Sequence, residues 1–577
     1  MLTNLNLTDM ETCYKAIRGD LARSLPVHPL SQAVALRSRR GVSAGMVAAQ
    51  PNLGVLPLRA NRRVTRQPAG RGVAWLIAAL AMIVGTIVID AYPVGTMHDD
   101  GLYVILAKSL ATGHGYRWLQ LPDAPAATHF PPGYPLLLAM LWKLVPSFPA
   151  NVLVFKLANV VCVAVTAFLL ARLMRERWAF SSAWQAAVTL LGVLGIPMLL
   201  LSTLVMSEPL FLLLVVLALG LAERVTEGSE RRIWMIVALG LLIALSTLVR
   251  THGIALVAAV TLLLFFRGRR RDAIIVLGAA GAVLMPWQIW AATRPASALR
   301  DMSGMYQTYT AWLSAGFRTD GIGMLWRTAA RTLPDSLRML GELGGFGRPE
   351  LRTIGLAVLG GLSVAGLRPL WRRAPVTALF MGLYATILIL WPYTPTRFIC
   401  AVWPLVVLLP ALGARDLLAW RPSDTGRRGV RVVLLAGTVL VLAGHASYTA
   451  LGYQGRWWSI RPRTVAPKLR PLITWVRQAT PPDATLALDE ESAVYLYTGR
   501  HTVPVEAFTV HEFFVPRTPA QDAEVLRQVL GHYAVDAVIL AGQPAYAAAR
   551  VLIASRPPVL AVRDTVADFL ILSPVVR

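Results

Sequence analysis

Apolar residues in this chain gather in runs long enough to form helices that cross a membrane. The first run covers residues 72–91, and a helix of about 20 residues at about 1.5 Å per residue spans the roughly 30 Å of a bilayer's hydrocarbon core. Similar runs follow at 151–171, 184–206, 208–222, 233–248, 253–266, 273–292, 353–367, 376–391, 398–412 and 432–451. The pattern predicts a mainly α-helical, polytopic membrane protein with about eleven transmembrane helices.

The composition supports this prediction. Hydrophobic residues make up 55% of the 577 residues, charged residues make up 15%, and the mean hydropathy is +0.55, which excludes an ordinary soluble globular protein. The net charge of +25 does not require nucleic acid as a partner, because the arginines form clusters between the apolar runs. Cys13, Cys162 and Cys400 are far apart in the sequence, so neither a disulfide framework nor a zinc site is predicted.

The positions of the arginine clusters predict the orientation in the membrane. Residues 1–71 are basic and rich in Gly, Pro and Ala, and we expect a disordered cytoplasmic arm. With this arm inside, the later clusters also fall in the cytoplasm: 172–177, 223–232, 267–271, 368–373 and 415–431. The transmembrane domain then covers 72–451, with a first external loop at 92–149 and a long external loop at 293–352.

The long loop at 293–352 carries many arginines against few acids. An anionic ligand and anionic lipid headgroups both explain this charge. Aromatic and leucine side chains alternate with the arginines, which is typical of amphipathic helices lying on the outer leaflet.

Residues 452–577 differ in character from the rest of the chain. Short β-rich runs alternate with helical patterns: strands are predicted at 485–488, 501–505, 537–540, 559–563 and 569–572, and helices at 491–497 and 520–532. We therefore expect a small soluble, extracytoplasmic α/β domain.

Two adjacent carboxylates, Asp99 and Asp100, follow the first apolar run closely. They lie where the first transmembrane helix has just emerged into water, at the start of a predicted amphipathic helix over 98–110. A second surface helix is predicted after the proline pair Pro131-Pro132, since its apolar run is short for a membrane span. The position of the carboxylates makes them the best candidates for chemistry.

Several short motifs lie in a fixed order on this topology. They are Asp99-Asp100 with Tyr103 and Ala107, Pro131-Pro132 with the following Tyr-Pro-Leu-Leu-Leu-Ala, Ser207-Glu208-Pro209-Leu210-Phe211, Leu248-Val249-Arg250 with Gly253, and Thr396-Arg397-Phe398 with Trp403-Pro404. In this order the chain resembles the polyprenyl-phosphate-sugar glycosyltransferases of the GT-C fold, specifically glycosyltransferase family 39 and the group of protein O-mannosyltransferases and aminoarabinose transferases. The resemblance covers most of 72–451.

The resemblance implies an integral-membrane glycosyltransferase of the bacterial cytoplasmic (inner) membrane. Such enzymes transfer a sugar from a polyprenyl-phosphate or dolichyl-phosphate-like donor to a glycan, lipid or protein acceptor on the outer face, with inversion at the anomeric carbon. The chemistry needs a carboxylate that takes the acceptor proton and cations that stabilise the leaving phosphate. No cofactor is implied, and a requirement for a divalent metal stays open.

The matching positions suggest a role for each residue. Asp99 matches the first acid of the family's pair and is expected to be the general base. Asp100 replaces a glutamate that is often second, and is expected to orient the acceptor or raise the pKa of its neighbour. The remaining candidates are Arg250, Arg397 and, where relatives place a lysine, His129 for the donor phosphate, with Glu208 and Tyr103 as substrate-site candidates.

Simpler explanations exist for the same residues. Acids just outside a membrane span are often only solvated, Arg250 can snorkel to the interface, Arg397 can cap a turn, and Glu208 suits a helix start. A transporter or flippase for a lipid-linked envelope precursor is the alternative function. It predicts ionisable residues in mid-span and internal repeats, whereas the charges gather at one rim and no repeat is found. A non-enzymatic scaffold for envelope assembly is a third possibility.

Overall fold

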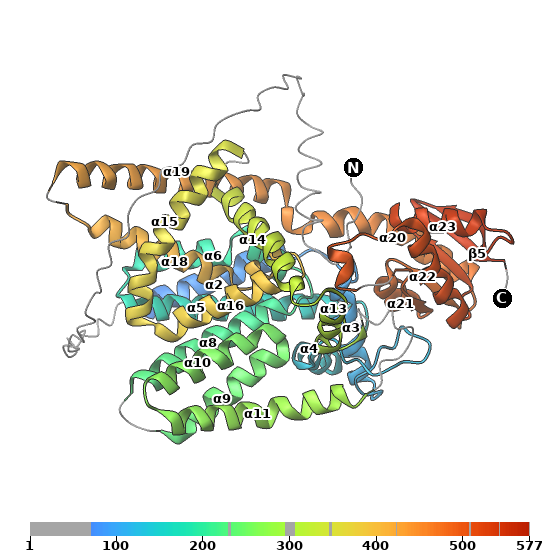
Figure 1. The fold of residues 1–577 in the computed structure, drawn as a ribbon, viewed down its shortest axis with the longest axis horizontal. Coiled ribbons are helices and arrows are strands. Elements are labelled where there is room, and N and C mark those ends of the chain that lie inside the picture. Colours follow the sequence, from blue (N-terminus) through green and yellow to red (C-terminus); the bar gives the residue numbers. More distant parts are fainter. Residues whose placement is uncertain are drawn as a thin grey trace, which may run out of the picture.

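The computed structural model describes residues 71–228, 232–294, 306–344, 349–422, 424–506, 509–541 and 543–575. A bundle of long helices forms the larger part, and an α/β domain built from the C-terminal residues lies beside one end of it (Figure 1). We call this the domain end of the bundle. The predicted basic arm, apart from Arg71, lies outside the described residues.

Each predicted apolar run coincides with helical structure. The helices of the bundle are α2 (Arg71–Val88), α5 (Asn151–Trp178), α6 (Ser182–Val193), α7 (Ile196–Ser202), α8 (Glu208–Glu227), α9 (Ile233–Val249), α10 (Ile254–Phe266), α11 (Arg270–Ala292), α15 (Pro349–Arg373), α16 (Pro375–Leu390), α17 (Thr396–Ala401), α18 (Trp403–Ala419) and α19 (Thr425–Gly455). Within the described residues, five helices are long and apolar enough to cross a membrane, or six with α6 and α7, which are bent by 56°, taken as one. The mainly helical, polytopic membrane architecture is confirmed, while the number eleven stays a prediction.

Glycines allow two helices of the bundle to pack closely, and large apolar side chains remain exposed on its outer surface. α15 and α18 cross at glycines: a Cβ on Gly413 would collide with the carbonyl oxygen of Leu362, and one on Gly366 would collide with that of Leu409. On the outside of the bundle large apolar side chains stay exposed, including Trp75 (65%). Exposed apolar side chains on long apolar helices are expected where lipid replaces water as the solvent.

Two helices, α3 (Asp99–Ala111) and α4 (Gly133–Leu144), lie at the domain end of the bundle (Figure 1). Both helices were predicted, but the amphipathic character expected for α3 is wrong. α3 is buried on nearly every side because it packs between α4 and the C-terminal domain. α4 instead keeps an exposed apolar stripe at Leu136, Met140 and Leu144, which are spaced to share one helix face.

The C-terminal domain contains a five-stranded sheet in the order β2-β1-β3-β5-β4. Its strands are β1 (Thr485–Leu488), β2 (His501–Val503), β3 (Ala537–Leu540), β4 (Leu560–Val566) and β5 (Phe569–Pro574). β1 pairs in parallel with β2 and β3, whereas β5 is antiparallel to β3 and β4. The helices are α20 (Ile460–Ala479), α21 (Glu491–Thr498), α22 (Pro519–His532) and α23 (Gln543–Ala554). All the predicted strands and helices are found; α20 and α23 were not predicted.

The described part of the long loop forms α13 (Tyr309–Asp320) and α14 (Gly323–Gly344). Trp326, Leu333 and Leu337 are exposed along α14, and their spacing places them on one face. Trp312 of α13 packs with Met324 and with Val510 of the C-terminal domain. The loop therefore contains the expected amphipathic helix and also contacts the domain.

The glycine contact between α15 and α18 predicts a specific sensitivity to substitution. Gly413→Ala places a methyl group against the Leu362 carbonyl, and we expect overpacking to lower the free energy of unfolding by about 1–3 kcal/mol. Thermal unfolding of the detergent-solubilised protein measures the effect. The control is Gly360→Ala on α15, where a Cβ meets nothing within 4 Å. Equal stability of the two variants would contradict the proposed close contact.

Candidate active site

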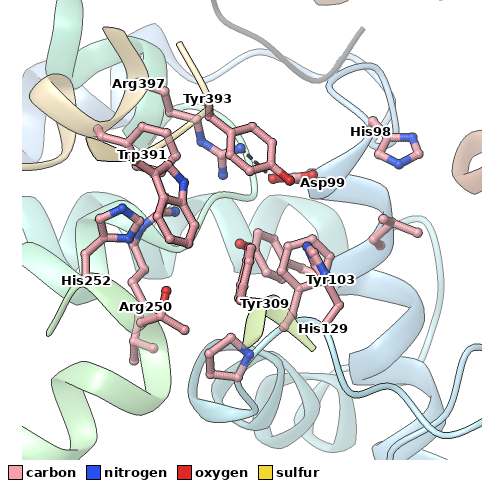
Figure 2. A pocket seen from close by; sticks show the side chains of 16 residues that line it. His98, Asp99, Tyr103, His129, Arg250, His252, Tyr309, Trp391, Tyr393 and Arg397 are labelled. Carbon is pink, nitrogen blue, oxygen red and sulfur yellow. Dashed lines mark hydrogen bonds and ion pairs between the residues drawn. The ribbon is translucent and has the colours of Figure 1, made fainter. Parts of the chain in front are cut away.

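A cavity lies at the domain end of the bundle, and its volume of about 850 Å³ includes space that is open to solvent. Segments far apart in the sequence meet there: the start of α3, the loop before α4, the 3₁₀ turn η2 (Thr251–Gly253), α13 and the link between α16 and α17 (Figure 2). The residues lining it are His98, Asp99, Leu102, Tyr103, His129, Phe130, Pro131, Val249, Arg250, Thr251, His252, Tyr309, Trp391, Tyr393, Arg397 and Phe398. Of the candidate residues, Asp99, Tyr103, His129, Arg250 and Arg397 are thus brought together.

Asp99 is the first residue of α3, and its carboxylate points toward the guanidinium group of Arg397 (Figure 2). Nη1 of Arg397 donates a hydrogen bond to Oδ2 of Asp99 at 2.5 Å. Burial raises the pKa of the Asp99 carboxyl, but the charge of Arg397, aided by His98, outweighs burial and leaves this pKa below its usual value. Asp99 is therefore a carboxylate at neutral pH, and its proton affinity depends on where Arg397 lies.

Glu208, the first residue of α8, lies beneath the cavity and does not line it. Its Oε1 accepts hydrogen bonds from Nε of Arg397 and from Nη1 of Arg250, the latter at 2.8 Å. Nη1 of Arg250 also lies 3.0 Å from Oγ of Ser207, which is 3.1 Å from the hydroxyl of Tyr103. Glu208 thus holds both guanidinium groups in place, and its position at a helix start serves this contact.

Both arginines keep donor capacity that the protein does not use. Nε of Arg250 is buried and has no hydrogen-bond partner within the described residues. Nη2 of Arg397 contacts the sulfur of Met206 at 3.9 Å, and thioether sulfur is a weak acceptor. Two acids and two arginines make the cluster formally neutral, so an anionic ligand would give the cluster a net negative charge unless it displaces one of the acids.

His129 lines the cavity, but it does not supply positive charge at neutral pH. Its Nδ1 is 2.7 Å from the carbonyl oxygen of Gln307, and because a carbonyl only accepts hydrogen bonds, we assign the ring proton to Nδ1. Burial lowers the pKa of His129 to about 4. The ring packs against Tyr309 with centroids 4.2 Å apart. The neutral ring leaves Nε2 as an acceptor, which weakens its predicted role in binding phosphate.

Asp100 lies outside the cavity, contrary to the expectation of a role beside Asp99. Its carboxylate accepts hydrogen bonds from the backbone N–H groups of Gly95 and Met97, both at 3.0 Å. Successive residues of a helix point about 100° apart, so the side chain of Asp100 cannot follow that of Asp99. Burial raises the pKa of Asp100 despite these hydrogen bonds. Its observed contacts brace the turn that leads into α3.

Aromatic rings that the sequence analysis did not propose as site residues form much of the cavity wall, although Phe398 belongs to the Thr396-Arg397-Phe398 motif. His252 stacks on Phe398 with centroids 4.7 Å apart, Tyr309 lies 5.5 Å from Trp391, and Trp391 stacks on Tyr393 at 6.1 Å. No spacing in the sequence marks these residues, because they come from separate loops and corners. Apolar walls with a few convergent polar groups are typical of small-molecule sites. Within the described ranges, no group of three or more His, Cys, Asp or Glu residues is placed to hold a metal ion.

Comparisons with known proteins identify the fold. No protein-family profile and no curated protein sequence matches the chain. The crystal structure of ArnT from Cupriavidus metallidurans bound to undecaprenyl phosphate is similar, with a TM-score of 0.54 and 14% identity over 88% of this chain and 98% of that one. Its apo structure gives a TM-score of 0.49 at 13% identity, with the same coverage of both chains.

The cryo-EM structure of the arabinofuranosyltransferase AftD from Mycobacteria gives a TM-score of 0.43 at 14% identity, over 88% of this chain and 40% of that one. At such identities a similarity establishes the fold, and the undecaprenyl-phosphate complex of ArnT carries the assignment. The protein has the polytopic GT-C membrane fold seen in ArnT.

Proposed function

We propose that this protein is an integral-membrane glycosyltransferase. It transfers a sugar, with inversion, from a polyprenyl-phosphate donor to an acceptor at the domain end of the bundle. The observation that carries the proposal is the convergence of one carboxylate, Asp99, and two arginines, Arg250 and Arg397, on one cavity. The GT-C fold supports it, because the similar ArnT structure contains undecaprenyl phosphate. The positive-inside pattern supports a cytoplasmic N-terminus and an outer-face site in a bacterial inner membrane.

In this proposal the arginines bind the donor phosphate. Both guanidinium groups line the cavity and supply charge-assisted hydrogen bonds to the donor phosphate. These bonds strengthen as the sugar–phosphate bond breaks, since the leaving phosphate gains negative charge in the transition state. The aromatic rings that line the cavity give the sugar a wall that excludes water, which favours transfer over hydrolysis.

Asp99 acts as the general base in the same step. The acceptor oxygen attacks the anomeric carbon, its proton passes to Asp99, and the polyprenyl phosphate leaves with the bonding electron pair. The ion pair with Arg397 makes Asp99 a weak base in the ligand-free protein. A donor phosphate that draws Arg397 away raises the pKa of Asp99, so donor binding prepares the base. This exchange also accommodates an anion in a cluster that is already charge-balanced.

Asp99→Asn tests the role of the base. The change removes the proton acceptor and the ion pair with Arg397, but it keeps the size of the side chain. We expect transfer of radiolabel from a polyprenyl-phosphate sugar to fall by about 10²- to 10⁴-fold, while binding of undecaprenyl phosphate is retained. Asp123→Asn, at an exposed position of the same loop, is the control. A well-folded Asp99→Asn enzyme with near wild-type turnover would reject the assignment.

Lysine substitutions test the phosphate site. Arg250→Lys and Arg397→Lys keep the charge but lose the planar fork that binds two oxygens at once. Each is expected to weaken the binding of undecaprenyl phosphate by about 10- to 100-fold, as for loss of a charge-assisted hydrogen bond worth about 1.5–3 kcal/mol. The matched control is Arg318→Lys on the exposed face of α13. Unchanged binding in both cavity variants would favour a structural or snorkelling role.

A further inference from the structure

The first turn of α21, in the C-terminal domain, packs directly against the segment that presents Asp99. Gly95 has a φ of +94°, and a Cβ there would lie 2.8 Å from Cα of Ala493. Oγ of Ser492 donates a hydrogen bond to the carbonyl oxygen of His98 at 3.3 Å. Two features exclude a side chain at Gly95: the positive φ of the backbone, which favours glycine, and the close approach of the neighbouring helix α21. The domain therefore fits closely against the residues just before Asp99.

Two further hydrogen bonds hold the same segment from the domain side. Nε of Arg461, in α20, donates to the carbonyl oxygen of Thr96 at 2.6 Å. The backbone N–H of Val94 donates to the hydroxyl of Tyr497, in α21, at 3.2 Å. Arg461 and Tyr497 are more than 300 positions away in the sequence, so the backbone that leads to Asp99 is fixed by long-range contacts as well as by its own turn.

Glu491 extends these contacts to the opposite wall of the cavity. The hydroxyl of Tyr306 donates a hydrogen bond to Oε1 of Glu491 at 2.5 Å. The carbonyl oxygen of Tyr306 accepts from Oγ1 of Thr128 at 3.3 Å, and that of Gln307 accepts from Nδ1 of His129 at 2.7 Å. The position of Tyr306 thus fixes the neighbouring carbonyl group of Gln307, which accepts the Nδ1 proton of His129. Tyr309, which lines the cavity, follows a few residues later.

The side chain of Glu491 is buried among other titratable groups. Its side chain is 1% exposed, and its Oε1 lies 3.7 Å from Nε2 of His98 at the cavity edge. Asp489 and the hydroxyls of Tyr306 and Tyr533 are the other titratable groups that act on it. Burial raises the pKa of Glu491 to about 8, and burial lowers the pKa of His98. At neutral pH the pair is therefore mainly uncharged, and within the described residues no cation contributes to the pKa of Glu491.

We propose that Glu491 is a positioning residue of the transferase site and that the C-terminal domain completes this site. Through Tyr306 it holds the wall that carries His129, while its own helix clamps the turn that presents Asp99. The catalytic part of this inference rests on the proposed function. The structural part, that the domain orders the 306–309 segment, stands on the contacts alone.

The structural part is tested by hydrogen–deuterium exchange of the ligand-free full-length protein in detergent. Tyr306→Phe removes the hydroxyl but keeps the ring, and Glu491→Ala removes the acceptor. Both are expected to increase amide exchange at least threefold in peptides covering 306–309 and 94–101. Glu524→Gln, an exposed acid on α22, is the control. Unchanged exchange in Tyr306→Phe, the milder variant, would overturn the proposal even if Glu491→Ala fails to fold.

The pH dependence of ligand binding tests the link to the site, with undecaprenyl phosphate as the probe. An exposed glutamate ionises near 4.5 and the buried Glu491 near 8, so the docked state loses stability as pH rises between these values. Wild-type affinity is expected to fall by up to about tenfold between pH 7 and pH 9. Glu491→Gln keeps an oxygen acceptor for Tyr306 but cannot ionise, and it is expected to remove this fall. Glu524→Gln should retain it.

Identical pH profiles of the wild type and Glu491→Gln would overturn the link between Glu491 and the site. If the wild type does not bind undecaprenyl phosphate at any pH, the proposed donor is wrong, and the exchange experiment still decides whether the domain orders the 306–309 segment. The two failures are therefore distinguishable.

Discussion

The contact of Arg397 with two carboxylates is the interaction on which the site depends. Its guanidinium group binds Asp99 at the start of α3 and Glu208 at the start of α8, and Glu208 binds Arg250 beside η2. Buried charges are costly unless they are paired and hydrogen-bonded. Satisfying these charges therefore fixes the relative positions of three helix starts and one corner, and the cavity is the space that this arrangement leaves.

The balance of charge in this cluster links ligand binding to the chemistry. In the proposed function, a donor phosphate replaces Asp99 at Arg397, and this exchange raises the basicity of the acid that is released. Asp99 lines the cavity, whereas Glu208 is buried and does not line it, so the proposal takes Asp99 as the acid that is released. It thereby gives two carboxylates that contact one guanidinium group different roles: one responds to the ligand and the other is structural.

The C-terminal domain is part of this arrangement and is more than an appended module. Its helices α20 and α21 contact the turn before Asp99. Its short helix η4 (His511–Phe513) contacts α13, which follows Gln307, the hydrogen-bond partner of His129. Burial raises the pKa of Glu491, a buried acid at this junction, to about 8, so at neutral pH it is mainly uncharged and packs closely without the cost of a buried charge. The walls of the cavity are therefore set from both the bundle and the domain.

The sequence by itself determined the elements and several of the reactive side chains. Runs of apolar residues and alternating patterns are local signals, so the bundle helices and strands such as 485–488 follow from them. The position of Asp99 after the first run made it a candidate, and the family resemblance added Arg250 and Arg397. Only the tertiary structure decided which side chains meet. It turned Asp100 away from Asp99, placed Glu208 beneath the arginines, left His129 neutral and buried α3 on nearly all sides. These outcomes depend on contacts between distant segments and on burial, which no local pattern of residues encodes.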